Sequence, residues 1–177
     1  MPMLSPAISI RRNIVAGSRE QLSNLAIELV KAPTAETMQL LAELDQALSG
    51  PYSAEQRHAL SVEQLFQPDI RFFQVRVDGV AVACGGIAFL DGYGELKRMY
   101  SRPSVRGRGV AKALLHRLEA EARDAGLSLL RIETGAYQKE ALKFYEGAGY
   151  RRCGAFGPYA QMPPQAIETS RFYEKQL

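Results

Sequence analysis

Cysteine and histidine are scarce in this sequence, with two residues of each among 177. Cys84 and Cys153 do not have the spacing of metal ligands, and only His58 and His116 are available to complete a site. A structural zinc site and a disulfide framework are therefore both disfavoured. We expect no bound metal and two free thiols.

Long apolar runs are also missing. No stretch approaches the roughly 18 apolar residues that a membrane-spanning helix requires. The first twelve residues, MPMLSPAISIRR, carry their charges after their apolar residues, which is the reverse of a secretory signal. We therefore expect a cytoplasmic protein without a membrane partner.

The sequence has little excess of charge of one sign. Its formal net charge of +3 is too small to predict a nucleic-acid partner, so any basic ligand site must be local. A chain of 177 residues that is 46% hydrophobic can bury one core but not comfortably two. We expect one domain over residues 24–177, preceded by a poorly patterned N-terminal extension over residues 1–23.

Helical patterns dominate the start of the domain. Residues 25–31 fit both an alternating strand and a helical stripe, and periodicity alone does not decide between them. After Pro33, Thr34 is a candidate N-cap for a helix that ends at Gly50-Pro51. This helix has an apolar stripe through Met38, Leu41, Leu44 and Leu48. A shorter helix is predicted over residues 62–66, ended by Pro68.

From Ile70 the pattern changes to strands. Asp78-Gly79 is a turn favoured in tight hairpins, and it joins strands predicted over residues 70–77 and 80–89. A second Asp-Gly pair leads to GELKRMYS, residues 94–101, a third strand. In a regular strand one face would carry Glu95, Lys97, Met99 and Ser101, and the other Leu96, Arg98 and Tyr100.

A helix follows the third strand, entered through the sequence RGRG and ended by Gly126. Its expected core stripe consists of Val110, Ala111, Leu114, Leu115, Leu118 and Ala122, and its expected solvent face of Lys112, His116, Glu119 and Arg123. Further strands are predicted over residues 127–133, from 150–153 and over 169–174, with a helix over 139–147. The sum is a mixed α/β (α+β) domain, with a largely antiparallel sheet flanked by helices.

The RGRG loop has the features of an anion site. Amides in the first turn of a helix have no intrahelical partners, and the peptide dipoles place about half a positive charge there. Gly107 and Gly109 allow a ligand close to the backbone, and Arg106 or Arg108 can bond phosphate oxygens. A solvated basic turn is the alternative. The loop matches neither G-x-x-x-x-G-K-[ST] nor G-x-G-x-x-G, so a nucleotide triphosphatase and a dinucleotide dehydrogenase are disfavoured.

Two sequence blocks resemble the GNAT superfamily of acyl-CoA-dependent N-acyltransferases. RGRGVA, directly after the strand ELKRMYS, matches the superfamily's pyrophosphate loop [QR]-x-x-G-x-[GA] at Arg106, Gly109 and Ala111. ETGAYQKEALKFYEGAGYRR is similar to its later motif. The resemblance covers residues 36–177, is strongest over 94–152, and implies a single-domain member of bacterial type with the GNAT fold. By analogy it also makes residues 25–31 the first strand.

The resemblance implies acetyl-CoA as cosubstrate and a binding role for particular residues. The pyrophosphate would lie on the loop residues Arg106, Gly107, Arg108, Gly109, Val110, Ala111 and Lys112. The pantetheine arm would lie along Met99, Tyr100 and Ser101. A backbone group near Met99 would polarise the thioester. Gln138 stands where many members have an asparagine that contacts the arm.

Two residues are candidates for acid–base catalysis. Tyr145 matches the tyrosine that commonly protonates the departing thiolate, and a core aromatic is its alternative role. A general base is useful because an amine of pKa near 10.4 is deprotonated at pH 7 only at a cost of about 4 to 5 kcal/mol. Glu95 is the candidate, because it would share a strand face with Met99 and Ser101 and because members of the superfamily often place a base at this depth, directly or through water. Its alternative role is an ion pair with Lys97 or Arg98. His58 and His116 are not expected to be catalytic.

The acceptor is expected to be a small-molecule amine. Two regions are candidates to bind it: residues 48–67, with Tyr52, Glu55, Arg57 and His58, and residues 154–166, with Phe156, Tyr159 and Met162. The expected function is therefore acetyl-CoA-dependent N-acetyltransferase. A non-catalytic acyl-CoA-binding module is the alternative, a nucleic-acid binder is a distant third, and a homodimer is left open.

Overall fold

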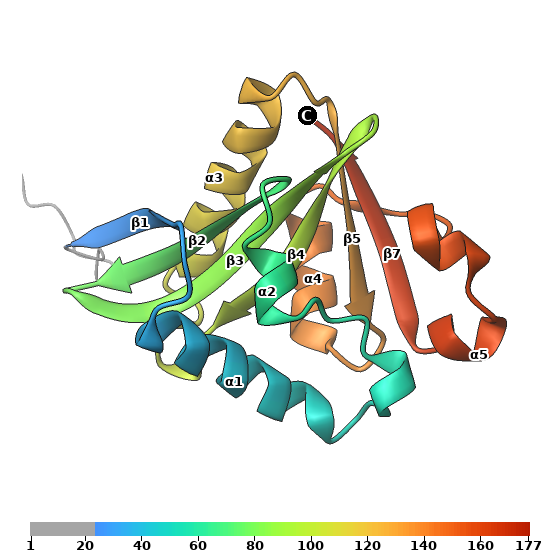
Figure 1. Cartoon of the computed structure of the whole chain (residues 1–177), viewed down its shortest axis with the longest axis horizontal. Helices are drawn as coiled ribbons and strands as arrows, with labels where there is room; N and C mark the ends of the chain where they lie inside the picture. Colours follow the sequence, from blue (N-terminus) through green and yellow to red (C-terminus); the bar gives the residue numbers. More distant parts are fainter. Residues whose placement is uncertain (1–23) are drawn as a thin grey trace, which may run out of the picture.

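A seven-stranded sheet organises residues 24–177, the part of the chain that the computed structural model describes (Figure 1). The strand order is β1-β2-β3-β4-β5-β7-β6. All neighbouring strands are antiparallel except β4 and β5. The mixed, mostly antiparallel sheet was predicted and is confirmed. The predicted extension, residues 1–23, lies outside the described residues.

The elements follow the predicted boundaries closely. The strands are β1 Leu25–Val30, β2 Ile70–Val77, β3 Val80–Leu90, β4 Tyr93–Ser101, β5 Leu129–Gly135, β6 Arg151–Arg152 and β7 Ser170–Gln176. The helices are α1 Ala35–Ser49, α2 Val62–Leu65, α3 Val110–Asp124, α4 Lys139–Gly147 and α5 Pro164–Ile167. The ambiguous segment at residues 25–31 is the strand β1, paired with β2.

The predicted turns and caps form as expected. Asp78 and Gly79 both have positive φ, 50° and 82°, which suits a tight hairpin between β2 and β3. Thr34 caps α1 by accepting a hydrogen bond from the amide of Thr37. Gly126, with φ 78°, ends α3. Short-range turn chemistry therefore sets these boundaries.

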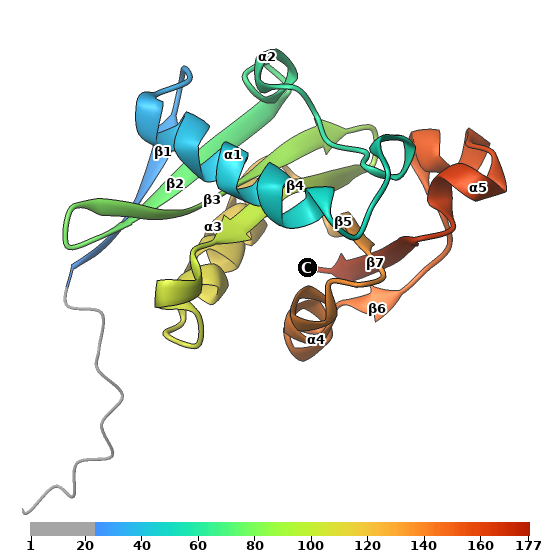
Figure 2. The same ribbon diagram turned by 90° about the horizontal axis from the view of Figure 1, so that it is seen from below.

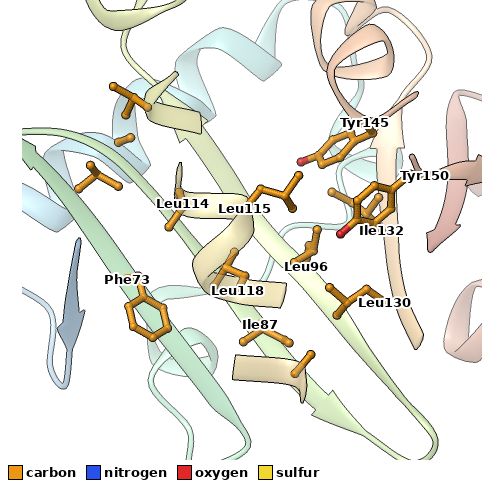
Figure 3. Close-up of a cluster of buried hydrophobic side chains, with 14 of the residues drawn as sticks. Phe73, Ile87, Leu96, Leu114, Leu115, Leu118, Leu130, Ile132, Tyr145 and Tyr150 are labelled. Carbon is orange, nitrogen blue, oxygen red and sulfur yellow. The ribbon is translucent and has the colours of Figure 1, made fainter. Parts of the chain in front are cut away.

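Helices cover both faces of the sheet, and the apolar clusters that they bury differ in size. Figure 2 shows α1 and α2 on one face and α3 and α4 on the other. The larger apolar cluster lies under α3 and α4, and Figure 3 shows its leucines together with Tyr145 and Tyr150. A smaller cluster lies under α1 and α2. Both faces of the central strands are thus buried, as their near-continuous apolar sequence requires.

Three side chains lie differently from the helical patterns. Met38 is 42% exposed, because α1 buries Leu40, Leu41 and Leu44 instead. Ala111, expected in the core stripe of α3, is only partly buried. Glu119, expected in solvent, is buried.

The burial of the Glu119 carboxylate is compensated by hydrogen-bond partners from outside α3. The carboxylate of Glu119 accepts hydrogen bonds from the Lys175 ammonium at 2.7 Å and the Tyr150 hydroxyl at 3.3 Å. A buried carboxylate is tolerated when it is paired in this way. The pattern within one helix cannot reveal such distant partners.

Cys84 is buried, Cys153 is partly buried, and neither forms a disulfide, so the prediction of free thiols is confirmed. Among residues 24–177, no helix combines the length and apolar character needed to cross a membrane.

Candidate active site

The strands β4 and β5 separate along their length. They are paired only at Gly94 with Leu130 and at Glu95 with Arg131. Beyond these pairs the strands diverge, and Figure 1 shows α4 beside the widening gap. The sheet is therefore open at its centre, between two strands that each continue for several residues.

A β-bulge in β4 sets which side chains enter this opening. Lys97 pairs with Gly86 of β3, but the next pair joins Tyr100 to Cys84, so β4 carries one extra residue. Arg98 at the bulge has φ 57°, in the left-handed region. An extra residue reverses the alternation of side chains beyond it.

The prediction that Glu95, Lys97, Met99 and Ser101 share one face of the strand is therefore wrong. Glu95 and Lys97 face the side of α1, and the bulge turns Met99 and Ser101 to the side of α3. Met99 packs against the cluster under α3, and Tyr100 packs under α1. The sequence GELKRMYS carries no glycine or proline at the bulge to signal it.

A large cavity of about 890 Å³ lies between the RGRG loop and α4. Its lining includes every residue predicted to bind the cosubstrate except Arg108: Met99, Tyr100, Ser101, Arg106, Gly107, Gly109, Val110, Ala111, Lys112, Gln138 and Tyr145. One continuous cavity thus joins the predicted loop, strand and helix positions.

The RGRG loop has the backbone geometry of an anion cradle. Gly107 and Gly109 have φ values of 73° and 86°, a conformation that other residues rarely adopt. Among residues 24–177, no protein acceptor bonds the amides of Gly109, Val110, Ala111 or Lys112. These free donors at the N-terminus of a fifteen-residue helix fit a diphosphate.

Arg106 closes one side of the cradle. Its guanidinium donates to the carbonyl of Ser101 at 3.3 Å and forms an exposed ion pair with Glu140 of α4 at 3.1 Å. Because the pair is solvated, it is weak and can be exchanged for a ligand phosphate. The loop therefore offers one arginine to the cavity.

Tyr145 lies at the inner end of the cavity. It is 3% exposed and packs edge-to-face against Phe144 and Tyr150. Burial raises its pKa, so the phenol stays protonated at neutral pH. A protonated phenol beside a cavity can serve as a proton donor.

A second, smaller cavity of about 140 Å³ adjoins the first. Both cavities share Leu44, Met99, Gln138, Ala141 and Tyr145 as lining residues. The smaller one is enclosed by residues 52–60, the segment between α1 and α2, and by β4, β5 and Tyr159. The shared residues mark the place where molecules in the two cavities would meet.

Glu95 lines the smaller cavity, and one of its carboxylate oxygens accepts two hydrogen bonds. Its Oε1 accepts hydrogen bonds from the Lys97 ammonium at 2.6 Å and the Tyr159 hydroxyl at 2.7 Å. The ion pair is the alternative role that the sequence left open for Glu95. Burial, followed by the charge of Glu95, raises the pKa of Tyr159.

Glu133 is a second carboxylate in this cavity, and it was not among the residues predicted for the site. It lies on β5, where its Oε1 accepts a hydrogen bond from the Ser170 hydroxyl at 2.6 Å. Burial raises its pKa, and the Ser170 bond only partly offsets this. Glu133 is the first residue of the block ETGAYQKEALKFYEGAGYRR, but the block assigned no role to it. Its place beside Glu95 in the cavity depends on the pairing of β4 with β5.

The predicted acceptor regions contribute to the cavity in part. Tyr52, Arg57, His58 and Tyr159 line it, whereas Glu55, Phe156 and Met162 do not. His58 bonds the carbonyl of Ala166 through Nε2 and lies against the ring of Tyr159. The hydroxyl of Tyr52 accepts from the amide of Tyr137. His116 is exposed on α3, away from both cavities.

An anion cradle at a helix N-terminus, an elongated cavity along a splayed strand and an adjoining polar pocket define a class of protein, the acyl-CoA-dependent acyltransferases. The sequence profile described as Acetyltransferase (GNAT) family matches residues 37–150. The chain belongs to this family. It is therefore an acyl-CoA-dependent N-acetyltransferase.

Individual relatives agree with this assignment. An IAA acetyltransferase from Azospirillum brasilense is 45% identical over 142 residues, which are 79% of this chain and 90% of that protein. A candidate acyl-CoA N-acyltransferase from Klebsiella pneumoniae has a crystal structure with a TM-score of 0.68 and 33% identity, covering 86% of this chain and 97% of that one.

A GNAT family acetyltransferase from Elizabethkingia anophelis, solved with acetyl-CoA bound, has a TM-score of 0.65 and 18% identity. The match covers 88% of this chain and 99% of that one. At this identity the likeness concerns the fold.

Proposed function

We propose that the protein transfers an acetyl group from acetyl-CoA, bound in the large cavity, to a primary amine of a small acceptor in the smaller cavity. The observation that carries this proposal is the junction of the two cavities at Met99 and Tyr145. Two substrates held at once on either side of a junction can react directly, without an acetylated enzyme.

The donor site is assigned from charge and shape. The free amides at the start of α3, with Arg106, suit the diphosphate of CoA, and the cavity continues along β4 towards Tyr145. Acetyl-CoA supplies the activated acyl group. The bulge leaves Arg98 and Met99 outside the β3–β4 register, so the backbone at Met99 is the expected donor to the thioester carbonyl.

Tyr145 and a carboxylate divide the proton transfers in this proposal. Tyr145 protonates the departing thiolate, since it lines the junction of the two cavities and its phenol carries a proton at neutral pH. Glu133 takes the proton of the acceptor ammonium, because burial makes it a stronger base than a solvated glutamate. Glu95, the base expected from the sequence, is bound by Lys97 and Tyr159, and we propose that it holds the polar wall in place.

The test is thiol release from acetyl-CoA across a panel of small amines. We expect amine-dependent release, lowered about 10²-fold in kcat by Tyr145→Phe, which keeps the packed ring and removes only the proton donor. Arg106→Ala should raise the KM for acetyl-CoA while affecting kcat less.

Tyr150→Phe is the matched control, because Tyr150 is an equally buried tyrosine that bonds Glu119 and lines neither cavity. If acetyl-CoA binds and no amine gives turnover, the chain is an acyl-CoA-binding module and the proposal fails. Full activity in Tyr145→Phe would remove the acid role.

A further inference from the structure

The smaller cavity contains cationic donors that lack acceptors. Among residues 24–177, three buried polar side-chain atoms have no hydrogen-bond partner, and two of them are the Nε atoms of Arg57 and Arg98. Both arginines line this cavity. Buried N–H donors without acceptors are rare, and each one calls for an explanation.

The lysine and arginine side chains around the cavity are paired with carboxylates except at one residue. Lys97 is paired with Glu95, and Arg98 is paired with Asp45 of α1 at 2.6 Å. Glu133 is bonded by Ser170. Within the described part of the chain, the side chain of Arg57 forms neither an ion pair nor a hydrogen bond, although it is partly buried. The cavity therefore has one cation left for a ligand.

The position of Arg57 separates it from the site of transfer. Tyr145 and Met99 line both cavities, whereas Arg57 lines only the smaller one, on the wall formed by residues 52–60. A ligand that reaches Arg57 with one end can present its other end to the junction. The planar guanidinium matches a carboxylate through two parallel hydrogen bonds.

We propose that the acceptor is an amine that also carries a carboxylate, of amino-acid size, and that Arg57 binds this carboxylate. The inference rests on the proposed function, since the amine of the same molecule receives the acetyl group at the junction. Arg57 is then the residue that determines specificity: it selects amino acids over plain amines and takes no part in the proton transfers.

The experiment compares amines in matched pairs that differ only by the carboxylate: glycine with methylamine, 4-aminobutyrate with propylamine, and lysine with 1,5-diaminopentane. We expect kcat/KM of the wild type to favour the carboxylated member of at least one pair by about 10- to 100-fold. Arg57→Gln should reduce this ratio to below about 3-fold, and Arg57→Lys should give an intermediate ratio. Arg151→Gln, on the exposed strand β6, should leave the ratio unchanged.

The inference is overturned if the wild type uses both members of every pair equally, or if Arg57→Gln slows both members equally. It is also overturned if 2-aminoethylphosphonate is preferred over all carboxylated amines, since the selected group would then be a phosphonate. Circular dichroism of each variant separates loss of fold from loss of selection.

A failure of the proposed function can be distinguished from a failure of this inference by measuring binding instead of turnover. If no amine is acetylated, calorimetric titration of the same amino acids into the CoA-loaded protein still decides the inference. Binding by the wild type that is lost in Arg57→Gln supports it, and no binding of any of them overturns it.

Discussion

Glu95 and Glu133 line the same cavity but differ in what holds them. Lys97 and Tyr159 both donate a hydrogen bond to the same oxygen of Glu95, so this oxygen already has two donors. Glu133 is bonded by a neutral hydroxyl and its pKa is raised by burial. A base works best when its pKa lies near the working pH.

Glu133→Gln should therefore lower kcat/KM by about 10²-fold and remove the acidic limb of its pH profile. In the wild type this limb should show activity falling as the pH drops through the raised pKa of Glu133. Glu95→Gln should keep the limb, with a smaller loss. Steady-state rates between pH 5 and 9 measure both variants, and a limb that vanishes in Glu95→Gln alone would reverse the two roles.

Glu133→Gln should lower activity but raise the stability of the fold. A carboxyl with a raised pKa in the folded state binds its proton more tightly there than in the unfolded chain. Its contribution to stability is therefore lost as the pH rises from the unfolded value, about 4.3, through the folded one. At pH 7.5 Glu133→Gln should raise Tm by a few degrees in calorimetry. An unchanged or lower Tm would contradict the unfavourable burial of this charge.

At the scale of elements, the glycines at the two ends of α3 provide a matched comparison. Gly109 begins the helix with φ 86° and Gly126 ends it with φ 78°, and a Cβ on either would meet no atom of the protein. The backbone penalty of a side chain is thus similar at the two ends, about 1–2 kcal/mol. Only Gly109 borders the large cavity.

Gly109→Ala and Gly126→Ala should therefore lower stability equally in denaturant titrations. Only Gly109→Ala, and more strongly Gly109→Val, should weaken CoA binding in calorimetry, because the new side chain points into the space of the diphosphate. Equal CoA affinity in all of these variants would count against the loop as the phosphate site.

The elements themselves were largely predictable, since their boundaries depend on local chemistry: the hairpin at Asp78-Gly79, the cap at Thr34, and the loop before α3. The bulge at Arg98 was not, because a non-glycine residue takes φ 57° there only through its place between β3 and α1, where its side chain bonds Asp45. The proposed cosubstrate site follows from the local sequence pattern. The proposed acceptor site, with Glu133 and Arg57, depends on contacts between distant segments.

At the scale of the whole molecule, the opening between β4 and β5 connects two sides of the sheet. The large cavity is bounded by the RGRG loop, α3 and α4, and the smaller one by residues 52–60, which follow α1. In the proposed function the donor and the acceptor have separate places and meet at the residues that line both cavities, Met99 and Tyr145 among them. The proposal then requires that both substrates be bound before the acetyl group moves.

The most direct test of this requirement is the initial rate of thiol release, measured against acetyl-CoA at several fixed concentrations of an accepted amine. Direct transfer in a ternary complex predicts double-reciprocal lines that intersect, and no thiol release without amine. Parallel lines, or a burst of thiol in the absence of amine, would show an acetylated enzyme and would contradict the two-cavity account.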